Sequence, residues 1–372
     1  MKSFRVLVLT VIGYLVFSSY AYAINDPNAA VVKLRDPNNG GCVEAGVMLN
    51  NCVADSSVNF DGLSNASSFI VEVGPGTFGQ MFCGGNGSVS SGKKISIRGA
   101  GVDKTTLASL TLFKDCSNTS FADMTLGGTG ISYAVVVINP GTTTTWTNVK
   151  LVGPWQEYCV GASTTGGKHY WFGSQILTAS GGGGGHYQVK CDQSWFFGSE
   201  ITAKGLLTSG EVIPFKVSGS ELHVYGSVIR ALGMGTGAPS DLHALTAVSA
   251  SGGQVHIHGT GIDVIAMNGA PVAAIALSAS NGAMIHANAS SYNLRTGAGG
   301  TVTRIIKDQL PNTHVHAPYI WEHIPEAPLV SVTGADMTTV TTGTSDGQPH
   351  LVIYSTNCTS KWYDTVDKMC RP

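Results

Sequence analysis

A short motif of alternating aromatic and apolar residues followed by glycine repeats along the chain, and this repetition limits the fold more than any other feature. Its copies read YWFGSQI, WFFGSEI, HVYGSVI and HIHGTGI, with a looser MIHAN at the end. They begin at Tyr170, Trp195, His223, His256 and Met284, so each copy follows the last after roughly 25–33 residues, as solenoid coils do. Upstream, the segments 121–126 and 146–151 match each other at a similar distance.

A period of this length with strand-like alternation is typical of a β-solenoid, in which each coil buries its apolar side against its neighbours. A helical solenoid would need apolar residues at a spacing of 3.6, and the sequence has almost none of that pattern. Composition agrees, since only 12% of residues are charged while 48 are glycine. We predict an all-β fold, a single-stranded right-handed parallel β-helix with a C-terminal cap.

Alternation also divides each repeat into inward and outward positions. The wholly apolar middle positions should point inward; they are Trp171, Phe196, Val224, Ile257 and Ile285. The flanking positions then form two outward columns. The first column is predicted to hold Tyr170, Trp195, His223, His256 and Met284, and the second Phe172, Phe197, Tyr225, His258 and His286.

Two outward columns of rings form one contiguous patch, which favours a binding surface. Flat aromatic and imidazole faces suit the apolar faces of sugar rings, and His, Tyr and Trp also form hydrogen bonds with hydroxyls. We therefore assign substrate binding to the first four residues of each column. The alternative is that a loop, a terminal segment or a second copy of the chain covers the columns. In the last case the columns would be a homo-oligomer contact.

No metal site and no cofactor are expected. The strands that carry the paired histidines show no accompanying carboxylate, and the chain has no C-x-x-C motif. The formal net charge of −2 offers no basic surface for nucleic acid.

The N-terminus predicts export. Lys2 and Arg5 precede an apolar run of about 12 residues, and Ala21-Tyr22-Ala23 resembles a cleavage site, so residues 1–23 are predicted to be a signal peptide. The run is shorter than the roughly 20 residues that a membrane span needs. We expect a secreted protein, extracellular or periplasmic, with an N-terminal cap region over 24–66, the β-helix over 67–310 and a C-terminal cap over 311–372.

Eight cysteines, an even number, are consistent with an oxidising compartment. Their spacing predicts four disulfides. The expected pairs are Cys42 with Cys52, Cys83 with Cys116, Cys159 with Cys191, and Cys358 with Cys370.

Two segments resemble the opening coils of pectin methylesterases. Residues 69–80 read FIVEVGPGTFGQ, similar to a V-x-P-G-x-Y strand and turn, and residues 94–107 read KISIRGAGVDKTTL, similar to an I-x-L-x-G-x-G-x-x-K-T coil. The resemblance extends over roughly residues 68–178 and implies the pectin-lyase-like fold. It also implies an extracellular polysaccharide of the plant cell wall as partner and a carbohydrate-esterase activity.

The catalytic motifs of that family are only partly present. Trp155-Gln156-Glu157-Tyr158 is similar to the Y-Q-D-T-L strand, so the resemblance assigns oxyanion binding to Gln156 and acid–base catalysis to Glu157. The aspartate nucleophile and the arginine motif are missing, and Tyr133 stands where the first glutamine should be. Asp192 and Glu200 are the remaining candidates for a second catalytic carboxylate, since Glu200 shares a repeat position with Gln175 on the neighbouring coil.

These sequence features predict one of two functions. The first is a secreted pectinesterase-like protein that binds a pectin-like polysaccharide and de-esterifies it. The alternative is a catalytically inactive β-helix that serves as a surface, adhesion or glycan-binding protein.

Overall fold

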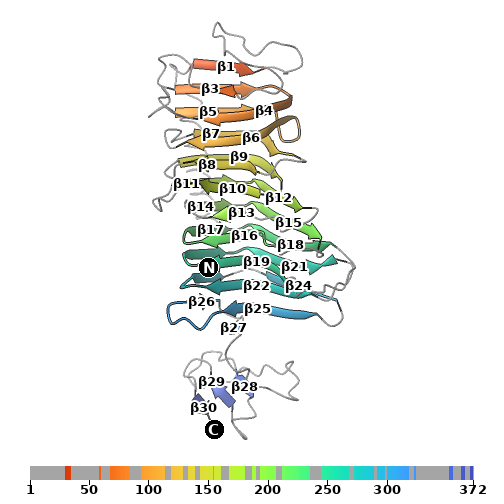
Figure 1. The fold of residues 1–372 in the computed structure, drawn as a ribbon, viewed down its shortest axis with the longest axis vertical. Coiled ribbons are helices and arrows are strands. Elements are labelled where there is room, and N and C mark those ends of the chain that lie inside the picture. Colours follow the sequence, from red (N-terminus) through yellow and green to blue (C-terminus); the bar gives the residue numbers. More distant parts are fainter. Residues whose placement is uncertain are drawn as a thin grey trace, which may run out of the picture. The chain divides into compact units, whose positions relative to one another are not determined.

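The computed structural model is a right-handed parallel β-helix, which confirms the predicted fold class (Figure 1). It describes residues 30–34, 58–59, 68–83, 94–113, 119–128, 133–138, 143–153, 155–160, 167–180, 187–189, 193–206, 212–234, 244–267, 272–288, 291–297, 300–317, 322–323, 352–354, 362–364 and 369–371. No α-helix occurs in these residues. The chain divides into two units, residues 1–323 and 324–372.

The first sheet carries the repeat motif, with one parallel strand from each coil. In stacking order its strands are β1 (Ala30–Leu34), β3 (Ser68–Val73), β5 (Lys94–Gly99), β7 (Thr119–Gly127), β9 (Thr143–Val152), β11 (Lys168–Phe172), β14 (Gln193–Phe197), β17 (Glu221–Tyr225), β20 (Gln254–His258), β23 (Met284–Asn288) and β26 (His314–His316). Parallel pairing therefore continues past residue 310.

The second sheet follows the first around a corner of each coil. It contains β4 (Gly76–Cys83), β6 (Thr105–Phe113), the later parts of β7 and β9, β12 (Gln175–Ser180), β15 (Glu200–Leu206), β18 (Val228–Met234), β21 (Gly261–Ala266) and β24 (Ser291–Arg295). The long strand β9 shows the corner directly, because its first half pairs with β11 and its end pairs with β12.

A third series of strands completes the coils. In the first coils it includes β2 (Val58–Asn59), the ends of β4 and β6, β8 (Tyr133–Ile138) and β10 (Trp155–Val160). It continues as β13 (Tyr187–Val189), β16 (Phe215–Ser218), β19 (Ala244–Ser251), β22 (Ala273–Ser280), β25 (Thr301–Lys307) and β27 (Glu322–His323). In the second unit, β28 (Val352–Tyr354), β29 (Trp362–Asp364) and β30 (Met369–Arg371) form an antiparallel sheet.

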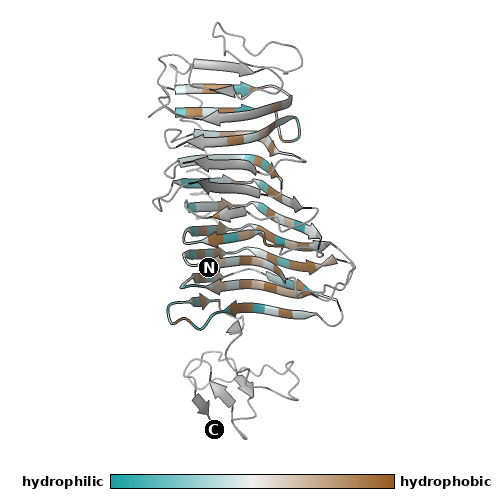
Figure 2. Ribbon diagram, in the orientation of Figure 1, coloured by the Kyte–Doolittle hydropathy of each residue, from teal (hydrophilic) through white to brown (hydrophobic). Residues whose placement is uncertain are grey.

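The interior of the solenoid is filled by the apolar positions of the repeat. Brown and teal alternate along the strands in Figure 2, as expected for strands with one buried and one outward side. All five predicted inward residues are at most 1% exposed, which confirms their direction. Four of the interior rings form a stack whose centroids are 4.3, 4.5 and 5.7 Å apart; they are Phe121, Trp146, Trp171 and Phe196.

The last predicted copy of the repeat is out of register. His256 pairs with His286 and Gln254 pairs with Met284, so the true step along the chain is two positions longer than the motif indicated. A slip of one position would exchange the two faces of the strand, but a slip of two keeps them. Alternation alone therefore could not detect the error. The first outer column continues through His286 and His316, and Met284 lies outside it.

The corner between the first and second sheets explains the Gly-Ser pair in the motif. Gly173, Gly198, Gly226 and Gly259 have φ values of 53–57°, in the left-handed region that glycine adopts without strain. The buried hydroxyl residue that follows each glycine forms hydrogen bonds between coils. For example, the Ser199 hydroxyl accepts from the Ser174 amide at 3.2 Å, and the Ser227 hydroxyl accepts from the Ser199 amide at 3.0 Å.

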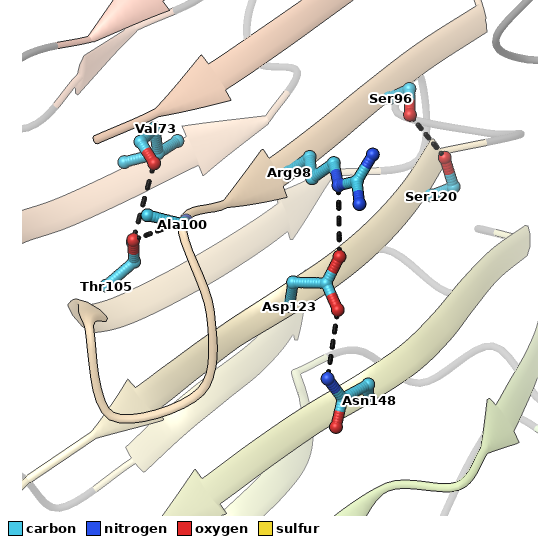
Figure 3. Close-up of polar contacts among 8 residues, drawn as sticks. All are labelled: Val73, Ser96, Arg98, Ala100, Thr105, Ser120, Asp123 and Asn148. Carbon is cyan, nitrogen blue, oxygen red and sulfur yellow. Dashed lines mark hydrogen bonds and ion pairs between the residues drawn. The ribbon is translucent and has the colours of Figure 1, made fainter. Parts of the chain in front are cut away.

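Upstream coils use polar residues at the same corner. Asp123 and Asn148 adopt left-handed φ values of 55° and 50°, and Asn148 Nδ2 donates to Asp123 Oδ1 at 2.9 Å. Arg98 Nε donates to the other carboxylate oxygen at 3.0 Å, which makes a row across three coils (Figure 3). In the segment 69–107, the Thr105 hydroxyl donates to the carbonyl of Gly74 at 2.8 Å. These contacts are structural.

Several sequence predictions fall outside the described residues or their side chains. The signal peptide lies in residues 1–23, which are not among the described ranges. Each predicted disulfide includes a cysteine outside those ranges, and the side chains of Cys83, Cys159 and Cys370 are not described. The disulfides therefore stay predictions.

Candidate functional site

The outward side of the first sheet carries the candidate site, two columns of stacked rings that we call the ring ladder. Its first column runs through Tyr170, Trp195, His223, His256, His286 and His316. The first five rings are nearly parallel, with centroids 4.9, 5.1, 4.6 and 5.3 Å apart and interplanar angles of 20° or less. The sixth is tilted by 48° at 6.1 Å.

The second column lies two residues further along the same strands. Phe172, Phe197, Tyr225 and His258 stack with centroids 5.1, 5.3 and 5.4 Å apart. All eight predicted binding residues are therefore placed in two continuous columns on one sheet. They are partly or fully exposed.

The rings of the ladder stack on one another, and this changes how the surface can bind. Trp195 lies between Tyr170 and His223, with both neighbours nearly parallel to it. Its two faces are therefore covered, and the same holds for the other rings inside each column. Ring edges and polar tips are what the ladder presents outward. The expected face-to-face stacking of sugars on the rings is consequently restricted to the ends of a column.

A row of polar residues borders the first column. It consists of Lys168, Gln193, Glu221 and Gln254, which are register partners on neighbouring coils. Gln193 Nε2 donates to Glu221 Oε2 at 2.7 Å, and the Lys168 ammonium lies 5.7 Å from the centre of the Trp195 ring. This row adds amide, carboxylate and ammonium groups to the apolar ring edges.

Glu221 is the site residue that the sequence analysis missed. It lies two positions before His223 on β17, so both side chains leave the same side of the strand. Its Oε1 lies 2.6 Å from His223 Nε2, and candidate ligand atoms of Glu221, His223 and His256 lie within 4.8 Å of one another. The premise that no carboxylate accompanies the histidines was therefore wrong. The E-x-H spacing on a predicted strand was the signal that could have found it.

Polar groups in and beside the ladder shift the pKa values of His256, His258 and Tyr225. The pKa of His256 is lowered by burial and by the neighbouring imidazoles of His223 and His286, although Glu221 acts in the opposite direction. The pKa of His258 is lowered by the same causes. Burial and the Glu221 carboxylate raise the pKa of Tyr225, so its hydroxyl keeps its proton near neutral pH. That hydroxyl lies 3.1 Å from His223 Nδ1.

The predicted catalytic residues lie on strands that do not pair with one another. Gln156 and Glu157 lie on β10, which pairs with β8, whereas Glu200 lies on β15, which pairs with β12 and β18. The side chains of Gln156 and Glu157 are not described, and Asp192 lies outside the described ranges. Their grouping into a catalytic site stays a prediction.

Glu200 itself belongs to an ion-pair row on the second sheet. Its carboxylate contacts Arg230 Nη1, and Arg230 Nε donates to Asp263 Oδ2 at 3.2 Å. The expected pairing of Gln175 with Glu200 on neighbouring coils is confirmed. Arg230 thus lies between two carboxylates on adjacent coils, which is an ordinary structural role for an arginine.

Comparison with known proteins defines no family for the chain. No protein-family model, no curated protein and no solved structure matches it. The described part of the chain contains no helix that is long and apolar enough to cross a membrane. What the fold defines is the class, a right-handed parallel β-helix protein with an architecture compatible with the pectin-lyase-like group.

Proposed function

We propose that the protein binds an extracellular polysaccharide along the ring ladder. The observation that carries the proposal is the continuous, partly exposed double column of rings bordered by the row of Lys168, Gln193, Glu221 and Gln254. Carbohydrates present C–H patches between hydroxyls. Ring edges and tips can contact both kinds of group, and amide and carboxylate side chains supply directed hydrogen bonds.

The dimensions of the ladder favour a chain-like ligand. Coils of a parallel β-helix repeat about every 4.8 Å, so the five steps from Tyr170 to His316 extend roughly 24 Å. A ring recurs at each step of the first column, and a polar neighbour accompanies the rings from Tyr170 to His256. A polymer that repeats along its length can use such a surface in several places, whereas a small ligand would use only one.

Replacing one central ring tests the proposal. We expect Trp195→Ala to weaken polysaccharide binding by about tenfold, or roughly 1.4 kcal/mol, because it removes ring edge and loosens the stack around Tyr170 and His223. Tyr225→Phe, which removes only a hydroxyl, should have a smaller effect. Affinity electrophoresis in gels that contain pectins and other plant or bacterial polysaccharides measures the change.

Val302→Ala is the matched control, because Val302 is a 51% exposed apolar residue on the third series of strands. It should leave binding unchanged. The proposal is overturned if the wild-type protein binds no polysaccharide in the panel, or if Trp195→Ala binds as well as wild type. An oligomer that the wild-type protein forms and Trp195→Ala does not, seen by light scattering, would instead favour assembly through the ladder.

De-esterification is the second candidate. It is favoured by the resemblance of residues 155–158 to a pectin methylesterase strand. The same purified protein can be tested in a pH-stat with methyl-esterified and acetylated pectin. Steady acid release by the wild-type protein that is lost in Glu157→Gln would support an esterase. If no acid is released, polysaccharide binding remains as the proposed function.

A further inference from the structure

We propose that Glu221, His223 and His256 form a binding site for a divalent transition-metal ion of the zinc class on the outer side of the first sheet. The site goes beyond polysaccharide binding and does not depend on it. Three features support this site: the position of the three ligand atoms, the groups that hold them, and the chemistry of the donor set.

The three side chains converge although they come from two coils. Glu221 and His223 share β17, and His256 is the register partner of His223 on β20. Their ligand atoms lie within 4.8 Å of one another. Zinc bonds of about 2.0–2.2 Å in tetrahedral geometry place ligand atoms about 3.4 Å apart, so small side-chain rotations would close the site.

Both imidazoles direct Nε2 toward the bordering row of polar residues. His223 Nε2 lies 2.6 Å from Glu221 Oε1, and His256 Nε2 lies 3.5 Å from the side-chain oxygen of Gln254 in the neighbouring position. The two rings are stacked within 10° of parallel at 4.6 Å. An ion beside the stack, between the histidine column and the polar row, can accept both lone pairs once the two rings rotate toward each other.

The outer groups of this cluster hold the ligands as metal sites require. Gln193 Nε2 donates to Glu221 Oε2 at 2.7 Å, which leaves Oε1 for an ion. The Tyr225 hydroxyl lies 3.1 Å from His223 Nδ1. When Nε2 binds an ion it carries no proton, and Nδ1 then carries one and donates to the Tyr225 oxygen. Such contacts to the second nitrogen fix the ring and its tautomer.

The donor set selects the class of ion. Two imidazole nitrogens and one carboxylate suit zinc and its neighbours, whereas calcium and magnesium prefer oxygen ligands. Three protein ligands also leave a coordination position open, which is typical of zinc sites that bind a further ligand.

Zinc binding by the purified, tag-free full chain tests the proposal. After chelator treatment, equilibrium dialysis against zinc at pH 7.5 with metal analysis should show a bound equivalent that Glu221→Gln and His256→Gln each weaken by about tenfold or more. His258→Gln is the matched control, because His258 lies on the same strand but outside the triad. The zinc affinity of this control variant should match that of the wild-type protein. Calcium and magnesium should not compete.

A second measurement distinguishes loss of zinc binding from misfolding of a variant. Zinc should raise the unfolding temperature of the wild-type protein and of His258→Gln, but not that of Glu221→Gln, because an ion stabilises only the state that binds it. Circular dichroism without zinc should be the same for all variants. The proposal is overturned if wild type retains no zinc, or if Glu221→Gln and His256→Gln retain it as tightly as wild type. Neither outcome depends on polysaccharide binding.

Discussion

At the scale of single residues, the indole nitrogen of Trp146 is a polar atom inside the interior ring stack. Trp146 is fully buried between Phe121 and Trp171, and its indole nitrogen has no hydrogen-bond partner among the described residues. A buried donor without a partner costs about 1–3 kcal/mol of stability. The stabilising contribution of Trp146 therefore comes from its ring, in spite of its N–H group.

We expect Trp146→Phe to lower the free energy of unfolding by less than about 1.5 kcal/mol, because loss of the unpaired donor offsets part of the lost packing. Trp146→Ala should cost about 3–5 kcal/mol, since the cavity is larger and the stack is interrupted. Urea denaturation followed by circular dichroism measures both. Equal costs for the two variants would contradict this account of the donor.

At the scale of the structural element, the repeating corner connects the coils through side chains as well as through the sheet. Each corner glycine turns the chain. The hydroxyl of the next residue accepts a hydrogen bond from an amide of the preceding coil and donates one to the carbonyl two residues earlier in its own coil. The interior amides at the corner are satisfied in this way. The motif consequently contains two kinds of requirement, a left-handed φ and a small hydroxyl side chain.

Ser199→Ala separates these requirements. We expect it to lower the free energy of unfolding by about 1–3 kcal/mol, because the buried Ser174 amide loses its acceptor at 3.2 Å. Gly198→Asn is the matched variant and should cost less than about 1 kcal/mol, since Asn148 has the equivalent conformation and a Cβ at Gly198 meets nothing within 4 Å. Urea denaturation measures the free energy of unfolding of both variants. A larger loss for Gly198→Asn than for Ser199→Ala would contradict the role assigned to the hydroxyl.

At the scale of the whole solenoid, the histidines of the ladder make stability depend on pH. Burial and neighbouring imidazoles lower the pKa of His256 and His258 in the folded protein. The unfolded chain, with ordinary histidine pKa values near 6.5, therefore binds more protons than the folded chain as the pH falls through that region. Protonation favours the unfolded state, and stability is lost toward acid pH.

We expect the unfolding temperature of the β-helix to fall between pH 7.5 and pH 5. The fall should be smaller in the double variant His256→Gln/His258→Gln, which removes the two groups whose pKa values are lowered. His223, His286 and Glu221 face the same region and are kept in that variant. Thermal scans in chelator exclude metal effects. An identical pH dependence in both proteins would refute the explanation.

The sequence by itself determined the fold class and the direction of each side chain in the repeat. Strand alternation has a period of two, and burial of Trp171 and Phe196 follows from it together with the outward position of Tyr170 and Trp195. The corner glycine was also visible, because glycine recurs in four successive copies of the motif, although Asp123 and Asn148 adopt the same left-handed φ in the upstream coils. These properties depend on neighbours within one strand, and the sequence records such neighbours directly.

Which residues meet between coils became clear only from the three-dimensional structure. The distance along the chain from one coil to the next varies, because the loops that join the strands differ in length. The sequence pattern could not tell that His286 and not Met284 follows His256, nor that Glu221 and His256 converge. It also could not show that the ladder rings cover one another's faces, since stacking depends on side-chain orientation across the spacing of about 4.8 Å between coils.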